Sequence, residues 1–221
     1  MKIVRFEYND KIYFGKLKDN NMIRLITGNI YDEYYLVDKE IELNKVRLLH
    51  PVTPPNIVAI GLNYKDHIEE GVHKELPDKP VIFIKATSSI IGPKDNIILP
   101  EAAAEEVDYE AELAVIIGKE AKNVDIDEVD DYILGYTCAN DVSARDCQLR
   151  LDKQWARGKS FDTFCPVGPW IETELKPKKC DIKSKLNGRI MQNSNTSHMI
   201  FSVREIVSYC SENMTLLPGT I

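Results

Sequence analysis

The feature that most constrains this chain is the run from Val107 to Gly118, in which polar and apolar residues alternate before the run becomes wholly apolar. Alternation with a period of two is typical of a β-strand, and the apolar continuation indicates that the strand enters the core. Asp108, Glu110 and Glu112 would then share one face. Same-face neighbours on a strand lie roughly 7 Å apart, so two of these carboxylates could bind one hard cation together.

The alternative interpretation of these acids is a solvated edge, because six acidic residues occur between positions 101 and 112. A third carboxylate favours the cation site. Asp141 follows a predicted buried strand over 132–139, at the point where a helix is expected to begin at Ser143. A carboxylate at the end of a strand is well placed to face a site, although the same residue could simply cap the helix.

Composition limits the class of protein. The chain has 221 residues, 43% of them hydrophobic, and a net charge of −7, which argues against nucleic-acid or anionic-membrane partners. No apolar run approaches the ~20 residues of a transmembrane helix, and the first residues lack the apolar region of a signal peptide. Five cysteines without a Cys-x-x-Cys pair predict reduced thiols. We expect a soluble, cytoplasmic protein.

The pattern along the chain predicts a strand-rich α+β fold in two parts. Strands are expected over 2–8, 11–17, 22–26, 57–60, 81–85 and 97–100, helices over 64–70, 123–131 and 201–211, and a hairpin around Asn187-Gly188. Three prolines between Pro51 and Pro55 can join neither a helix nor a central strand, so they mark a linker. We therefore predict a small N-terminal β domain over 1–53 and a larger domain over 54–221.

Two pairs of residues have the spacing of functional groups on a helix. His67 and Glu70 are three residues apart, so the carboxylate could orient the imidazole and the pair could activate water. Arg145 and Gln148 have the same spacing, and arginine can bind a substrate carboxylate with two parallel hydrogen bonds. Spacing alone favours ordinary surface residues for both pairs. Lys85 ends a predicted strand and could point into the site, although a lysine at the end of a strand is usually solvated.

Four segments together resemble the fumarylacetoacetate hydrolase superfamily, in its branch of acylpyruvate hydrolases and 2-hydroxyhepta-2,4-diene-1,7-dioate isomerases. They are Gly-Leu-Asn-Tyr-Lys-Asp-His-Ile-Glu-Glu from residue 61, Asp-Tyr-Glu-Ala-Glu-Leu-Ala-Val-Ile-Ile-Gly from residue 108, Gly-Tyr-Thr-Cys-Ala-Asn-Asp-Val-Ser-Ala-Arg-Asp from residue 135, and Trp-Ala-Arg-Gly-Lys-Ser-Phe-Asp from residue 155. The resemblance covers the chain from about Pro54 onward. It implies a mixed β-roll catalytic domain and a homodimer.

The resemblance also implies a role for each candidate residue. Glu110, Glu112 and Asp141 would bind Mg²⁺, Mn²⁺ or Ca²⁺. His67 and Glu70 would form a catalytic dyad on a mobile lid. Lys159 would bind the substrate and stabilise enolate charge, and Arg145 and Gln148 would contact the substrate, a small anionic 2-oxo acid.

The implied enzyme acts on this 2-oxo acid through a metal-bound enolate. C–C hydrolysis of an acylpyruvate is expected first, and tautomerisation, isomerisation or decarboxylation of a 2-oxo diacid such as oxaloacetate is the alternative. A non-catalytic module with a structural Ca²⁺ would explain the acids but would not require His67, Glu70 and Lys159.

Two positions depart from the family's pattern. The sequence stops at Ile221, before the strand and Thr-Gly-Thr-Pro loop that the resemblance places next, which implies a truncated or inactive catalytic domain or a differently built site. Leu62 stands where members that act on acylpyruvates or oxaloacetate often have arginine. Both departures leave the choice of substrate open.

Overall fold

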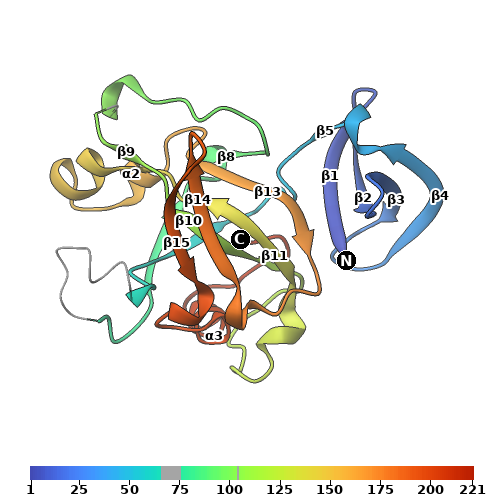
Figure 1. Cartoon of the computed structure of the whole chain (residues 1–221). Helices are drawn as coiled ribbons and strands as arrows, with labels where there is room; N and C mark the ends of the chain where they lie inside the picture. Colours follow the sequence, from blue (N-terminus) through green and yellow to red (C-terminus); the bar gives the residue numbers. More distant parts are fainter. Residues whose placement is uncertain (66–75, 104) are drawn as a thin grey trace.

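The computed structural model describes residues 1–65, 76–103 and 105–221. The prediction of a strand-rich α+β fold is confirmed, because strands dominate the described chain and its longest helix is α3 (Val203–Asn213). Figure 1 shows β1 to β5, the strands between Lys2 and Leu48, gathered on one side, and the later strands, with helices α2 (Ala156–Lys159) and α3, on the other. Among the described helices, none is long and apolar enough to cross a membrane.

The first four strands form an antiparallel meander; the turn residues between the first three predict it, whereas the fourth strand was not predicted. They are β1 (Lys2–Tyr8), β2 (Lys11–Leu17), β3 (Met22–Gly28) and β4 (Tyr34–Glu42). The turn between β1 and β2 uses Asn9 and Asp10, which both have positive φ, at 51° and 58°. Asn and Asp tolerate this conformation better than other residues with a side chain, so the turn fixes the register of the hairpin.

The larger part of the chain is organised around five strands: β6 (Ile57–Gly61), β7 (Val81–Lys85), β10 (Ala111–Ile117), β11 (Ile133–Asn140) and β13 (Cys165–Glu172). The main sheet runs in the order β10-β11-β13-β1-β2-β3-β4. β1 pairs with β13 through Ile3 and Ile171, so the sheet continues from the N-terminal strands into the larger part. Whether residue 53 divides two domains therefore stays a prediction.

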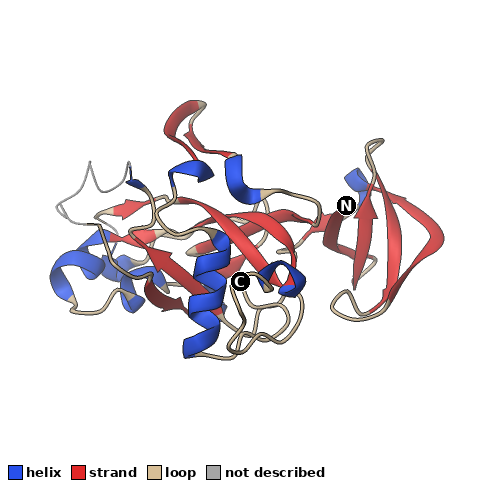
Figure 2. Ribbon diagram, turned by 90° about the horizontal axis from the view of Figure 1, so that it is seen from below, coloured by secondary structure: helices blue, strands red, loops and turns tan. Residues whose placement is uncertain are grey.

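The remaining elements complete the fold. The strands are β5 (Arg47–Leu48), β8 (Ile90–Ile91), β9 (Val107–Asp108), β12 (Ser143–Ala144), β14 (Asp181–Leu186) and β15 (Arg189–Asn195), and a short helix, α2, spans Ala156–Lys159. The predicted Asn187-Gly188 hairpin joins β14 to β15, and both turn residues have positive φ. Helix α3 packs against β10, and the C-terminus lies beside it (Figure 2). All five cysteines are free.

Three predicted elements are wrong. Residues 97–100 form no strand, and the side chain of Ile98 is 60% exposed. Residues 123–131 form no α-helix, because the Asp125 side chain accepts a hydrogen bond from the amide of Asp127 and favours a turn; only a 3-10 turn, η4 (Val129–Tyr132), follows. The helix expected from Ser143 begins two residues later, because Ser143 and Ala144 form β12, which pairs with β9. The helical segment continues as a π-helical turn, η5 (Cys147–Leu151).

The strand expected over 107–118 is interrupted. β9 ends at Asp108 and β10 begins at Ala111, so Tyr109 and Glu110 lie in neither strand. The backbone of Glu110 instead hydrogen-bonds to the end of β11 and the residue after it. Its amide donates to Asn140 Oδ1 at 2.9 Å, and its carbonyl accepts from the Asp141 amide at 2.8 Å. Two of the predicted acids, Glu110 and Asp141, are therefore neighbours in the fold.

Candidate functional site

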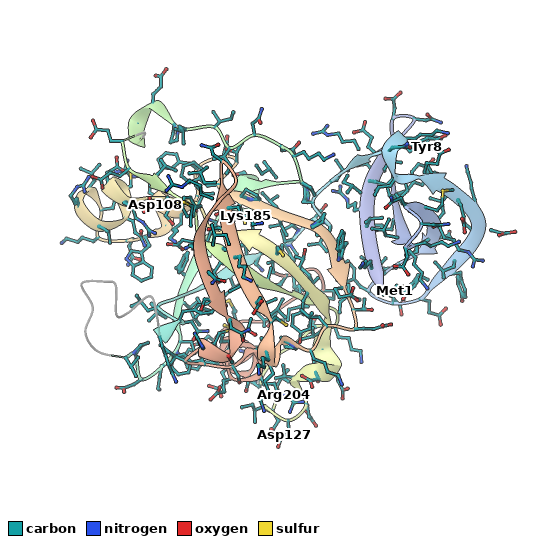
Figure 3. All side chains as sticks on the ribbon, viewed as in Figure 1. Met1, Tyr8, Asp108, Asp127, Lys185 and Arg204 are labelled. Atoms are coloured by element: carbon teal, nitrogen blue, oxygen red, sulfur yellow. The ribbon has the colours of Figure 1, made fainter. Side chains whose placement is uncertain are left out.

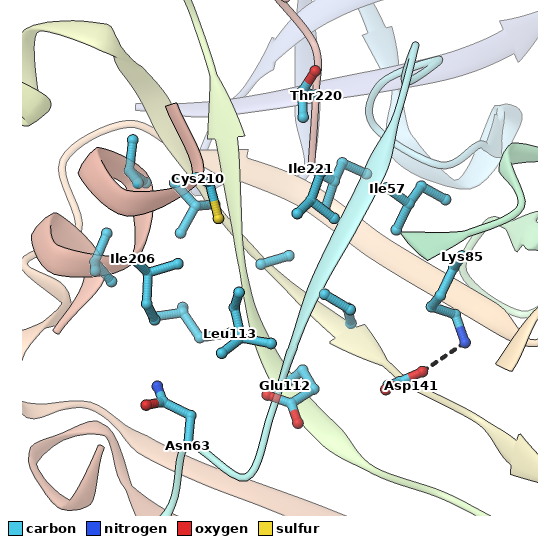
Figure 4. Close-up of a pocket in the computed structure, with 18 of the residues that line it drawn as sticks. Ile57, Asn63, Lys85, Glu112, Leu113, Asp141, Ile206, Cys210, Thr220 and Ile221 are labelled. Atoms are coloured by element: carbon cyan, nitrogen blue, oxygen red, sulfur yellow. Dashed lines mark hydrogen bonds and ion pairs between the residues drawn. The ribbon is translucent and has the colours of Figure 1, made fainter. Parts of the chain in front are cut away.

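Two of the predicted acids, Glu112 and Asp141, line a cavity between β6, β10 and α3. Its volume is about 150 Å³, and most of its wall is apolar. Glu112, Asp141 and Lys85 are its charged lining residues. Figure 4 shows Glu112 and Asn63 at one end of the cavity and Thr220 and Ile221 at the other. The cavity therefore combines an apolar body with a small group of convergent charges, which is the usual composition of a ligand site.

Two buried lysines bind the acids. Lys159 Nζ lies 2.7 Å from Glu110 Oε2 and 2.7 Å from Asp141 Oδ2. Lys85 Nζ lies 2.6 Å from Asp141 Oδ1, the ion pair drawn in Figure 4. Both lysine residues are only 2% exposed. A buried ammonium requires such partners, so the lysines and carboxylates hold each other in position.

Arg145 adds a third cation. Its Nη2 lies 2.7 Å from Glu110 Oε1, its Nε lies 2.8 Å from Asp108 Oδ2, and its Nη1 donates to Gln148 Oε1 at 2.7 Å. The structure thus brings Arg145 and Gln148 together, as their spacing predicts. The guanidinium contacts acids of the same chain, and these contacts would have to be exchanged for any contact with a substrate carboxylate.

These charges shift the ionisation of the three acids in different directions. Burial opposes ionisation of Glu110, but the neighbouring Lys159 and Arg145 lower its pKa to about 2. Burial, together with the charges of Glu110 and Asp141, raises the pKa of Glu112 well above its usual value. Burial also raises the pKa of Asp141, although both lysines oppose this shift. Lys159 alone opposes the shift of Glu112, whereas two cations compensate each of its neighbours.

The residues fit a hard divalent cation in the chemistry of their ligands, since carboxylate oxygens are what Mg²⁺, Mn²⁺ and Ca²⁺ prefer. Burial and the negative charges of Glu110 and Asp141 raise the pKa of Glu112, and a bound cation would offset both effects. In the arrangement described, however, no three His, Cys, Asp or Glu side chains are grouped closely enough to hold a metal. Lys159 lies between Glu110 and Asp141 instead. Metal binding would require this ammonium to move.

The remaining predicted residues fall into two groups. His67 and Glu70 lie outside the described residues, so the proposed dyad is not tested. Asp108 is more exposed than the other predicted acids: its side chain is 56% exposed, pairs with Arg145, which also binds Glu110, and lies on the side of the molecule toward α2 (Figure 3).

One residue of the site was predicted only as the less favoured alternative. Lys85 is buried against Asp141, whereas its position at the end of β7 favoured a solvated lysine. The only sequence signal was that this lysine closes an apolar strand, Val-Ile-Phe-Ile, without a second charge beside it.

Comparison with known proteins shows the family of this chain. Residues 56–221 match the family described as fumarylacetoacetate (FAA) hydrolase C-terminal, and residues 1–51 match one described as Rv2993c-like, N-terminal. The chain is 45% identical over 185 residues to the rat mitochondrial oxaloacetate tautomerase Fahd2a; the match covers 82% of this chain and 58% of that protein.

Solved structures agree with this assignment. A 5-carboxymethyl-2-hydroxymuconate delta-isomerase from Mycobacterium smegmatis matches with a TM-score of 0.91 and 38% identity, over 100% of this chain and 86% of that one. A maleylpyruvate hydrolase from Sphingobium, solved with manganese(II) and pyruvate, matches with a TM-score of 0.80 and 28% identity, over 100% and 86%. Because the family match covers well over half of the chain, this protein belongs to the fumarylacetoacetate hydrolase family, a family of enzymes.

Proposed function

We propose that this protein is a divalent-metal-dependent enzyme that interconverts the keto and enol forms of a small 2-oxo diacid such as oxaloacetate. The observation that carries the proposal is that Glu110 and Asp141 both bind the buried Lys159, with Glu112 near enough that their charges help to raise its pKa. The tautomerase relative, at 45% identity, supports this reaction, and so does the isomerase of known structure. A cation held by these three acids would polarise the substrate's carbonyl.

The chain's own cations would do the remaining work. Arg145, once released from Glu110, can bind a substrate carboxylate with two parallel hydrogen bonds, and Gln148 keeps the guanidinium oriented. Lys159, once displaced from the acids by the cation, would offer its ammonium to the negative charge that develops on the substrate oxygen. Its burial, with only 2% of the residue exposed, would strengthen this interaction, because charges are less screened there.

The test is an assay of oxaloacetate tautomerisation followed by ultraviolet absorbance with Mg²⁺ or Mn²⁺ present. Glu110→Gln should abolish turnover, because it removes a carboxylate on which Lys159 and Arg145 both depend. Glu120→Gln, which changes an exposed acid on the same segment, should leave the rate unchanged. Full activity of Glu110→Gln would remove the acid cluster from the mechanism.

The second candidate function is hydrolysis of an acylpyruvate, which the His67 and Glu70 pair in the sequence and the structural likeness to maleylpyruvate hydrolase favour. Hydrolysis needs an activated water, whereas tautomerisation does not. His67→Ala should therefore slow acetylpyruvate hydrolysis by at least ~100-fold, the usual scale of acid–base catalysis, and affect tautomerisation less. If neither substrate reacts while a chelator lowers the melting temperature strongly, a structural metal would be the better explanation.

A further inference from the structure

An aromatic ring lies beside the ammonium of Lys159. The Nζ atom of Lys159 is 5.2 Å from the centroid of the Phe83 ring. A cation within about 6 Å of an aromatic centroid is attracted by the face of the ring, and the attraction is stronger away from water. Lys159 is almost fully buried, so this contact is of the stronger kind. The ammonium therefore has two kinds of partner, two carboxylates and one ring.

Strand β7 supplies both this ring and the second lysine of the site. Phe83 and Lys85 are two residues apart in β7, so their side chains project from the same face of the strand. Lys85 donates to Asp141 Oδ1 at 2.6 Å and to the Val142 carbonyl at 3.3 Å. One side chain of β7 thus binds an acid of the site, and another contacts the ammonium that bridges two acids.

A second aromatic residue keeps the Phe83 ring in position. The ring centroids of Phe83 and Trp155 are 5.6 Å apart and their planes meet at 75°, the edge-to-face arrangement that aromatic pairs prefer. The Trp155 carbonyl accepts a hydrogen bond from the Lys159 amide at 3.1 Å, so Trp155 also fixes the short helix that carries Lys159. The indole lies so close to Gly61 that an added Cβ atom there would overlap it. Ring and lysine are therefore held by the same residue.

The two lysines would behave differently if a divalent cation bound. Lys159 donates to Glu110 Oε2 and Asp141 Oδ2, each at 2.7 Å, and these are its described hydrogen bonds. A cation on the same two oxygens would take both partners from Lys159. Lys85 would keep the other Asp141 oxygen and the Val142 carbonyl. Lys159 is therefore the lysine that has to move, and a buried ammonium requires another partner.

We propose that Phe83 is the positioning residue that holds the Lys159 ammonium when a divalent cation binds between Glu110 and Asp141. The ring already lies within range of Nζ, so the ammonium can leave the two carboxylates without leaving the ring. It then stays inside the site, where negative charge develops on the substrate. The inference rests on the proposed function, because it requires these acids to bind a metal.

Calorimetric titration of Mn²⁺ tests the role of the ring. Phe83→Leu keeps an apolar side chain but has no aromatic face. In the apo protein the carboxylates also hold the ammonium, so loss of the ring costs more in the metal-bound protein than in the apo protein. We therefore expect about tenfold weaker Mn²⁺ binding, the scale of a desolvated cation–π contact. Phe83→Tyr keeps the face and should bind Mn²⁺ within about twofold of wild type.

Phe161→Leu is the matched control. Phe161 pairs edge-to-face with Phe164, with ring centroids 5.4 Å apart, and no described lysine lies over its ring. This variant should bind Mn²⁺ like wild type. Equal binding by wild type and Phe83→Leu would overturn this inference alone. Absence of Mn²⁺ binding by wild type would overturn the proposed function and this inference with it.

A Lys159→Met background tests whether the ring acts through the lysine. Without an ammonium to displace, Phe83→Leu should change the Mn²⁺ affinity by less than about twofold, because the two substitutions remove the same contact. An equal loss of affinity in both backgrounds would mean that the ring shapes the acid site directly, which contradicts the proposal.

The fluorescence of Trp155 reports the movement without any change to Phe83. In a Trp170→Phe background Trp155 is the only tryptophan of the chain. Saturating Mg²⁺ should shift its emission maximum, because the ammonium changes its position against the ring that Trp155 contacts. The shift should disappear when Lys159→Met is added. A shift that persists in full without the lysine, or no shift in a protein that binds Mg²⁺, would overturn the proposal.

Discussion

At the scale of single residues, the site depends on charges that would be unstable alone. Lys159 and Lys85 are buried, and each is held by a carboxylate of the same cluster. Removing one member of a buried ion pair leaves the other desolvated and uncompensated, which costs more than the pair itself contributes. The cluster should therefore respond sharply to the loss of one charge.

Lys159→Met tests this dependence. In the presence of a chelator, we expect the free energy of unfolding to fall by about 3 kcal/mol, the usual cost of breaking a buried pair. Lys153→Met changes an exposed lysine and should alter it by less than about 0.5 kcal/mol. Urea denaturation measures both. Equal stability of the two variants would mean that Lys159 does not hold Glu110 and Asp141 in the apo protein.

At the scale of elements, the sequence predicts best where local signals agree with packing. Helix α3 begins with Ser202, whose hydroxyl accepts from the Glu205 amide while the Glu205 side chain accepts from the Ser202 amide. This reciprocal cap satisfies two amides that the helix leaves unpaired. α3 also forms a wall of the cavity, so its N-terminus helps to position the site.

Ser202→Ala should lower the free energy of unfolding by about 1 kcal/mol, because it removes this cap. Glu212→Ala, an exposed change near the other end of α3, is the matched control and should have little effect. Thermal denaturation followed by circular dichroism compares the two. If both variants melt together, the capping box contributes nothing measurable.

The failures of sequence-based prediction have physical causes. The run over 107–118 has the correct period, but alternation cannot reveal that Asn140 and Asp141 bind the backbone of Glu110 and interrupt the strand. The exposure of Asp108 could not be predicted for the same reason. The site role of Lys85 was not favoured because its partner Asp141 is distant in sequence, and only the folded chain brings the two together.

At the scale of the whole molecule, one sheet connects the two parts of the chain. Met1 contributes to this connection, since its amino group lies 2.9 Å from Glu172 Oε1. Ile3 and Ile171 are fully buried in a core cluster that also contains Val52 and Ile116. Contacts of this kind cross the predicted boundary at residue 53 and favour cooperative unfolding of both parts.

Ile171→Ala should therefore lower the stability of the whole chain by about 3 kcal/mol, the usual cost of a large-to-small change in a core. Denaturation followed by tryptophan fluorescence and by far-ultraviolet circular dichroism should give coincident transitions in the wild type and the variant. Two separate transitions would indicate that the N-terminal strands unfold independently.

The central claim is that Glu110, Glu112 and Asp141 hold one divalent cation for a 2-oxo acid substrate. Titration of Mn²⁺ by calorimetry tests it most directly, with Glu112→Gln as the variant, because only Lys159 opposes the rise in the pKa of Glu112. We predict one bound Mn²⁺ per wild-type chain and at least ~10-fold weaker binding to Glu112→Gln. Binding of equal strength in both proteins, or none in the wild type, would contradict the account.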